Sequence, residues 1–277
     1  MDTTFTVLPA NAEPFCLSNF SFPHGASHAE ELVQRAAQLG YSGLAITDEC
    51  SLAEILRAHV AAKEANLPFV VGSYFRLVNA DGSPAFGLIL LAQNREGYGN
   101  LSELIALART RGPKGTYRLT PHDLSRPDEE SSHLRGMPDC LAILIPHFPS
   151  KEEVLDVQIE WLEQTFPGRA WCGLVLHQRA MDDIHRGAVE YIAGGRGISV
   201  VALGQVVMHV RSRKPLQDTM TAIRVGRPVQ ECGRSGRQHD SECELGVFGP
   251  DVAGLLEQAS HCCRINDLLD DCVGVSN

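Results

Sequence analysis

The chain has 277 residues, of which 44% are hydrophobic and 21% are charged, and its formal net charge is -10. This composition is typical of a globular protein, and the acidic balance excludes a nucleic-acid footprint over the whole surface, because phosphate binding needs positive charge. No apolar run approaches the roughly 20 residues that span a bilayer, and residues 1–10 lack the features of a secretory signal. Nine cysteines without regular spacing favour a reducing compartment. We therefore expect a cytoplasmic protein that does not associate with membranes.

Apolar periodicity predicts alternating helices and strands over most of the chain. Two segments with capping-box spacing, Ser27 to Glu30 and Ser51 to Glu54, each open a predicted helix. In chain order we expect a helix ending at Gly40, strand 44–47, a helix ending near Asn66, strand 69–75, strand 87–92, helix 98–109, a turn-rich stretch 112–139, strand 141–145, helix 150–161, strand 173–176, helix 182–193 and strand 198–203. Strand, helix and strand in succession are typical of a right-handed parallel crossover.

The predicted strands are continuous apolar runs, which suit strands covered on both faces. A parallel (β/α) barrel fits this pattern best, and an open doubly wound sheet is the second choice. We expect one barrel domain over residues 12–233 and a divergent tail over 234–277 with one helix. Cysteines and histidines are frequent from Cys232 to Cys263, but their spacing matches neither a Cys-x2-Cys pair nor a zinc finger.

Five sequence blocks in the same order carry a resemblance to a known family. They are Cys16–Ser27, Leu44–Ala53, Leu90–Leu104, Lys114–Leu119 and Met208–Thr219. Together they resemble a PHP (polymerase and histidinol phosphatase) domain, and most closely the amino-terminal domain of bacterial error-prone DNA polymerases of the C family. The resemblance implies a distorted seven-stranded (β/α) TIM-like barrel whose carboxyl-end rim can hold up to three metal ions. It also implies a role in DNA replication, DNA damage and repair.

Most metal-ligand positions that the resemblance implies carry residues unable to bind a metal in this chain. The matching residues that keep a ligand atom are His24, Asp48, Glu49 and His147. The substituted positions are Phe15, Leu17, Tyr74, Gly87, Gln205 and Val207. A catalytic zinc site needs three protein ligands and a multi-metal site needs more. We therefore expect a degenerate metal site and no cofactor, with zinc or manganese only if a reduced site functions.

Three functional interpretations follow. In the first, the chain is the PHP domain of an error-prone polymerase, present as a separate or truncated chain. It would have a scaffolding role toward the rest of the polymerase or other replication and repair proteins, would contact DNA only indirectly, and would contain no polymerase active site. In the second, it is a metal-dependent phosphoesterase with Glu49 as ligand or general base. In the third, it is a stand-alone binding protein.

The third interpretation depends on a basic block over residues 209–227, which begins with His209, Arg211, Arg213 and Lys214. Guanidinium groups in such a run can hold a carboxylate or a phosphate in a forked geometry. A solvated surface remains the ordinary alternative for a run of charge. The functional alternative is a contact with another polymerase domain or with the template backbone.

Overall fold

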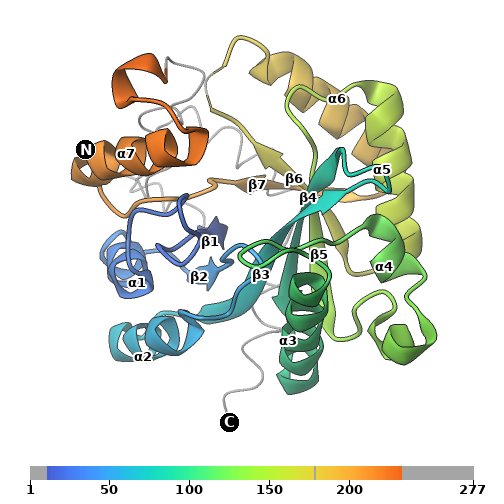
Figure 1. The fold of residues 1–277 in the computed structure, drawn as a ribbon, viewed down its shortest axis with the longest axis horizontal. Coiled ribbons are helices and arrows are strands. Elements are labelled where there is room, and N and C mark those ends of the chain that lie inside the picture. The colour runs from blue at the N-terminus through green and yellow to red at the C-terminus, as the bar shows by residue number, and fades with distance from the viewer. Residues whose placement is uncertain (1–10, 178, 233–277) are drawn as a thin grey trace, which may run out of the picture.

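The computed structural model describes residues 11–177 and 179–232, in which seven strands form one sheet in the order β1 to β7. The helices surround the strands (Figure 1). The elements are β1 (Ala12–Cys16), α1 (Ala29–Gln38), β2 (Gly43–Ile46), α2 (Ile55–Ala65), β3 (Phe69–Val78), β4 (Pro84–Ala92), α3 (Arg95–Thr110), α4 (Pro121–Ser125), η1 (Glu129–Leu134), β5 (Cys140–Ile145), α5 (Glu152–Thr165), β6 (Ala170–Val175), α6 (Asp182–Gly195), β7 (Ser199–Leu203), η2 (Arg211–Arg213), α7 (Lys214–Val225) and η3 (Val229–Glu231).

The first and last strands approach each other and nearly close the sheet into a barrel. Beyond β7, Val206 forms a parallel bridge with Cys16 at the end of β1. The N–H of Leu17 donates to the Val206 carbonyl at 2.8 Å, and the Val206 N–H donates to the Phe15 carbonyl at 2.8 Å. The predicted seven-stranded barrel is therefore confirmed, and the open doubly wound alternative is wrong.

One strand runs against the all-parallel arrangement that the apolar runs predicted. β4 pairs antiparallel with both β3 and β5, whereas the other neighbouring strands pair parallel. The connection from Val78 to Pro84 is a tight turn in which the N–H of Asn79 donates to the Ser83 carbonyl at 2.8 Å. A parallel crossover needs about a dozen residues or more, so a turn this short imposes a hairpin.

Both predicted capping boxes are displaced from the real helix starts. Helix α1 begins after His28, whose N–H donates to the Glu31 carboxylate at 2.9 Å, one position later than the Ser27 box. Helix α2 begins after Glu54, and the Ser51 hydroxyl instead accepts the N–H of Ala53 at 3.2 Å. Serine hydroxyls readily bond to nearby backbone in turns, so the same residue types open turns as well as helices.

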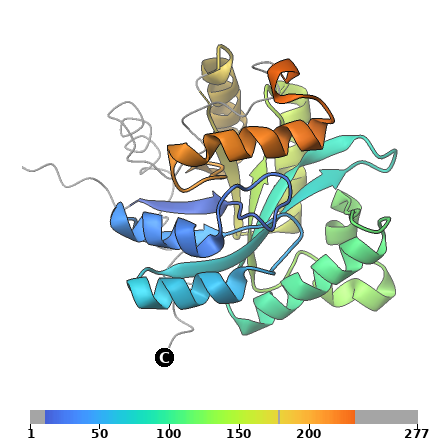
Figure 2. The ribbon, with the colours of Figure 1, turned by 60° about the vertical axis from the view of Figure 1, so that its left-hand side comes forward.

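Helix α7 was not among the predicted helices, although it begins at Lys214 inside the predicted basic block. It lies beside α1 and the loop that follows β1 (Figures 1 and 2). It ends at Gly226, whose φ of 68° is the left-handed conformation favoured at helix ends. The position of α7 brings residues near 220 against residues near 24.

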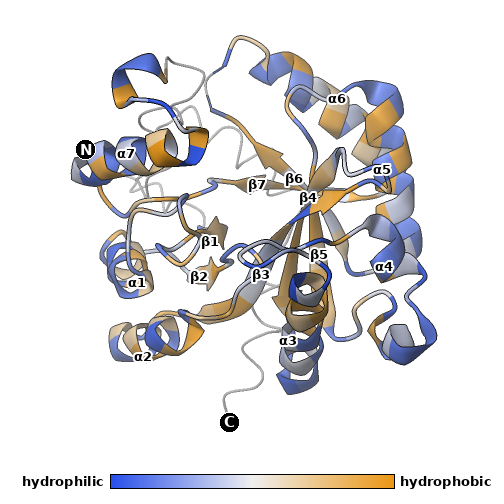
Figure 3. Ribbon diagram, in the orientation of Figure 1, coloured by the Kyte–Doolittle hydropathy of each residue, from blue (hydrophilic) through white to orange (hydrophobic). Residues whose placement is uncertain are grey.

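The core consists of apolar clusters on both sides of the sheet. One cluster joins residues of β1, β4, β5 and β7 and so fills the barrel, with Phe15, Ile89 and Ile143 fully buried. The helices turn hydrophobic sides toward the strands and hydrophilic sides outward (Figure 3). Cys16, Cys50, Cys140, Cys172 and Cys232 are buried. Among the described residues, no helix has the length and apolarity needed to cross a membrane.

Candidate functional site

A cleft of about 800 Å³ opens at the barrel rim where several strands end. Glu49 follows β2, His147 follows β5 and His177 follows β6, and all three line the cleft. Parallel strands in such barrels present their carboxyl ends to one face, where loop side chains converge. The structure thus brings two of the predicted ligands, Glu49 and His147, to one cleft.

Glu49 is the centre of a hydrogen-bonded cluster. Its Oε1 accepts the Arg76 Nε–H at 2.7 Å and the Tyr117 hydroxyl at 2.7 Å. The N–H of Arg76 in turn donates to the Tyr117 oxygen at 2.8 Å. Burial and the neighbouring Glu49 charge raise the pKa of Tyr117, so its phenol stays protonated and donates. One oxygen of the predicted ligand Glu49 is therefore already occupied by two donors.

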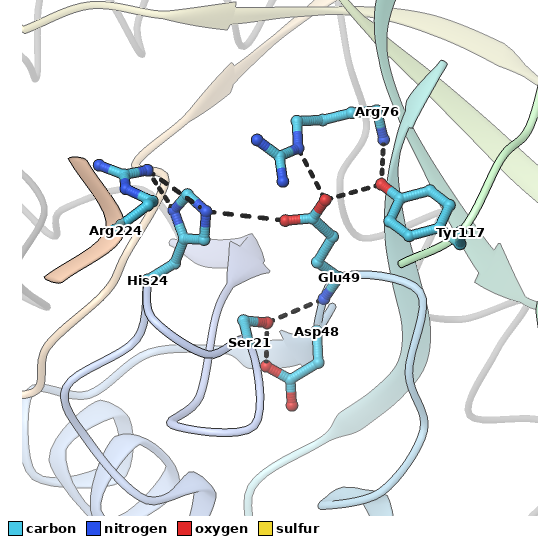
Figure 4. Close-up of polar contacts among 7 residues, drawn as sticks. All are labelled: Ser21, His24, Asp48, Glu49, Arg76, Tyr117 and Arg224. Atoms are coloured by element: carbon cyan, nitrogen blue, oxygen red, sulfur yellow. Dashed lines mark hydrogen bonds and ion pairs between the residues drawn. The ribbon is translucent and has the colours of Figure 1, made fainter. Parts of the chain in front are cut away.

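His24 lies between Glu49 and a second arginine. Its Nε2 is 3.8 Å from the Glu49 Oε2, and its Nδ1 accepts from the Arg224 guanidinium at 2.8 Å. Figure 4 shows Arg224 on one side of His24, and Arg76 with Tyr117 on the far side of Glu49. Burial, followed by the Arg224 charge, lowers the pKa of His24 to about 4. The imidazole is therefore neutral at pH 7, and both of its ring nitrogens lie within 3.3 Å of the Arg224 Nη1.

Asp48 has a structural set of partners at the base of the cluster. Its carboxylate accepts the N–H of Ser18 at 2.7 Å, the Ser18 hydroxyl at 2.6 Å and the Ser21 hydroxyl at 2.6 Å. The Ser21 oxygen also accepts the N–H of Glu49 at 2.8 Å. Asp48 thus fastens the loop after β1 to the loop after β2, and it positions both His24 and Glu49.

The other predicted ligand, His147, lies apart from this hydrogen-bonded cluster. It is exposed on the cleft wall, and its carbonyl accepts the Ser150 hydroxyl at 2.5 Å. His177, which the ligand pattern did not include, is 3% exposed, and its Nε2 is 3.0 Å from the Gln205 Oε1. Gln205, at a substituted ligand position, therefore contacts a rim histidine.

Apolar and aromatic side chains fill much of the space at the substituted positions. Phe15, Leu17 and Val207 are at most 2% exposed and belong to the cluster inside the barrel. The Phe15 and Tyr74 ring centroids lie 5.0 Å apart. A Cβ added at Gly87 would meet the Tyr74 ring at 2.9 Å, so the tyrosine occupies the space that a side chain at residue 87 would need.

The predicted basic block is mostly occupied by contacts within the chain. Arg213 pairs with Glu31 and Lys214 pairs with Asp218. His209 Nδ1 is 2.7 Å from the Ser27 hydroxyl. Arg211 is exposed. The block therefore connects α1 to the segment that enters α7.

Sequence reasoning missed four residues of the rim, Arg76, Tyr117, His177 and Arg224. A histidine directly after a predicted strand was a usable signal for His177, because strand ends form the rim. Arg76 directly follows the predicted strand that contains Tyr74, so the sequence offered a signal for this residue too. Tyr117 and Arg224 come from segments 68 and 200 residues away from their partners Glu49 and His24, and no spacing rule connects them.

Comparison with known proteins identifies the family. The profile described as "PHP domain" matches residues 16–164. The chain belongs to the PHP domain family.

Relatives of this PHP domain are error-prone DNA polymerases, which confirms the predicted resemblance. The chain is 58% identical over 250 residues to the error-prone DNA polymerase of Burkholderia mallei (strain ATCC 23344), a match that covers 86% of the chain and 24% of that polymerase. The Dechloromonas aromatica (strain RCB) polymerase is 46% identical over 271 residues, covering 95% of the chain and 25% of the polymerase. The chain thus spans about a quarter of the length of these relatives.

A solved structure shows the same fold. An amidohydrolase from Chromobacterium violaceum, with bound sulfate and no metal, aligns with a TM-score of 0.50, covering 70% of this chain and 86% of that protein. The sequence identity is 13%, so the likeness concerns the fold alone.

The charge arrangement of this PHP domain's rim determines which ligands it favours. Two guanidinium groups, Arg76 and Arg224, flank the His24 and Glu49 pair. A metal ion at this pair would meet two fixed positive charges, and like charges close together are repelled. The Arg76 side chain is 58% exposed, so an anion has access to it. Two positive charges thus flank the predicted ligands His24 and Glu49.

Proposed function

We propose that this chain is the PHP domain of an error-prone DNA polymerase, with a degenerate metal site and a structural role toward the rest of the polymerase. The observation that carries the proposal is that guanidinium groups and a phenol already donate hydrogen bonds to His24 and Glu49. The similarity to about a quarter of each polymerase supports the choice of partner. In this role the domain acts in the cytoplasm and contacts DNA through other polymerase segments.

Apolar packing at the substituted positions supports the proposed loss of the metal cluster. Phe15, Leu17 and Val207 are buried where the family resemblance implies ligands. Each fully buried large apolar side chain contributes roughly 1.5 to 3 kcal/mol. The rim can therefore fold and remain stable without a metal cluster to neutralise clustered imidazoles and carboxylates.

A structural role is tested by grafting. The matched region of the Burkholderia mallei polymerase would be replaced by this chain, and primer extension would be compared with the same polymerase lacking the region. We expect the graft to extend primers and the deletion to lose extension. We also expect His147→Ala in the graft to leave extension unchanged, as does His59→Ala, an exposed control on α2. Loss of extension with His147→Ala alone would contradict a purely structural role.

A metal-dependent phosphoesterase with His24, Asp48, Glu49 and His147 is the second candidate. It fits the geometry less well, because Asp48 accepts three hydrogen bonds and Glu49 pairs with Arg76. The test is hydrolysis of a chromogenic phosphate monoester with added Mn²⁺ or Zn²⁺. We expect no turnover above that of the metal ion without protein. Turnover that His147→Ala abolishes would establish the hydrolase instead.

The third candidate, a stand-alone binding protein using residues 209–227, retains Arg211 and Arg227 as exposed cations. Its Arg213 and Lys214 are already paired with Glu31 and Asp218. A salt-sensitive interaction abolished by Arg211→Glu would support this candidate.

A further inference from the structure

Outside the cleft, three potential metal ligands converge where α1 and α2 begin. His28, Glu30 and Glu54 place one imidazole nitrogen and two carboxylate oxygens within 4.8 Å of one another. His28 and Glu30 lie at the start of α1, and Glu54 immediately precedes α2. The residues come from segments about 25 positions apart, so the convergence is produced by the packing of the two helices.

Both carboxylates have an oxygen that no partner satisfies. Glu54 is 2% exposed, and in the described part of the chain its Oε2 and the Glu30 Oε2 are buried without a hydrogen-bond partner. A buried acceptor left unpaired costs roughly 1 to 3 kcal/mol, and more when the group is charged. Two such oxygens next to each other are an arrangement that a bound cation would relieve.

Arg57 neutralises the negative charge of Glu30 and Glu54 only weakly. Arg57 Nε is 4.0 Å from the Glu30 Oε1, and Arg57 NH1 is 3.8 Å from the Glu54 Oε1, at the outer limit for ion pairs. The Arg57 side chain is 60% exposed. The local charge is therefore negative in excess of what Arg57 neutralises.

We propose that His28, Glu30 and Glu54 bind a divalent metal ion that accepts mixed nitrogen and oxygen ligands, such as Mn²⁺ or Zn²⁺. One imidazole and two carboxylates are a ligand set that both ions accept. The exposed His28 leaves a route for the ion and for coordinating water, whereas the buried Glu54 fixes the inner side of the site. The ion joins the starts of α1 and α2, away from the flanking arginines of the rim.

Mn²⁺ is the better probe, because cysteines elsewhere in the chain attract zinc and manganese prefers oxygen ligands. The full chain, fully reduced, would be titrated with Mn²⁺ and free ion measured by electron paramagnetic resonance. We expect one Mn²⁺ per chain. Glu54→Gln and His28→Ala should each weaken binding at least about 100-fold, since loss of a residue that merely supports a ligand costs 10- to 100-fold.

Matched controls lie on α2, where Glu64 and His59 are exposed and outside the ligand group. Glu64→Gln and His59→Ala should bind Mn²⁺ as the parent does. Circular dichroism would check that the variants fold. If Glu54→Gln does not fold, the variant His28→Ala, at an exposed residue, decides the outcome.

Two results would overturn the proposal. Absence of Mn²⁺ binding would mean that Glu30 and Glu54 share a proton instead of an ion. Binding that persists in His28→Ala and disappears in His147→Ala would locate the ion at the rim and contradict the proposed degenerate site. Binding lost with His28→Ala and retained with His147→Ala supports the α1–α2 site and leaves the proposed function unaffected.

Discussion

The Tyr74 ring lies against Gly87, and this contact predicts how a methyl group added at residue 87 would affect stability. A Cβ at residue 87 would lie 2.9 Å from the Tyr74 Cε2 and 3.1 Å from the Ile145 Cβ. Because the Tyr74 ring and Ile145 must shift to admit the added carbon, we expect Gly87→Ala to lower the free energy of unfolding by about 1 to 3 kcal/mol. Urea denaturation measures the change. Gly99→Ala, in exposed helix α3 with no atom near its added Cβ, is the control and should be neutral or slightly stabilising.

His24 predicts a specific dependence of stability on pH. Its pKa is lowered to about 4 from the usual 6.5, so the unfolded chain takes up the proton first as the pH falls. Stability contributed by the neutral imidazole is present above about pH 6.5 and is lost between 6.5 and 4. His24→Asn keeps an acceptor for Arg224 and removes the titration. From pH 7 to 4 the parent should lose about 2 to 3 kcal/mol more than the variant; parallel curves would contradict this assignment.

The sequence predicted individual rim residues better than their partners. His24 and Glu49 were placed by motif, and the structure brings them within 3.8 Å of each other. Nothing in the sequence indicated that Arg224, 200 residues later, would donate to His24. A side chain's neighbour across a barrel is set by the packing of helices that share no local pattern, so local rules identify candidate ligands without showing what neutralises them.

Among the elements, the segment before α1 is fastened to the one that leads into α7. The Ser27 oxygen is 2.7 Å from His209 Nδ1 and accepts the His209 N–H at 3.0 Å, with Ser27 only 1% exposed. Ser27→Ala removes both bonds, so we expect a loss of about 1 to 3 kcal/mol in the free energy of unfolding. Ser102→Ala, on the exposed face of α3, should change stability little. Equal urea midpoints for the two variants would show that the contact contributes nothing.

The same elements show why the sequence located strands more reliably than helix starts or strand direction. Apolar runs such as 141–145 are long enough to mark a buried strand whichever way it runs. The direction of β4 depends on the short turn before it, and the start of α1 depends on Ser27 having His209 as an alternative partner. Both are decided by contacts outside the local window.

For the molecule as a whole, closure of the barrel depends on a buried acid. Glu13 on β1 is 2% exposed, and its two carboxyl oxygens accept the N–H groups of Phe15 and Gly204, each at 2.8 Å. Gly204 directly follows β7, so this side chain joins the first strand to the end of the last. Glutamine has the same shape, but its amide nitrogen accepts no hydrogen bond. At pH 5, Glu13→Gln should therefore lower the free energy of unfolding by about 1 to 2 kcal/mol.

The cost of Glu13→Gln should depend on pH in a defined direction. Burial raises the pKa of Glu13 to about 8 from 4.5, so the folded protein holds a proton that the unfolded chain releases. The parent's stability from this group is fully present below about pH 4.5 and is lost as the pH rises toward 8, whereas glutamine does not titrate. The stability advantage of the parent over the variant, measured by urea denaturation from pH 5 to 8, should fall and then reverse as the pH rises. Glu64→Gln, exposed on α2, controls for loss of one acid. A difference that grows with pH would show that the two N–H donors outweigh burial and keep the barrel closed around an ionised carboxylate.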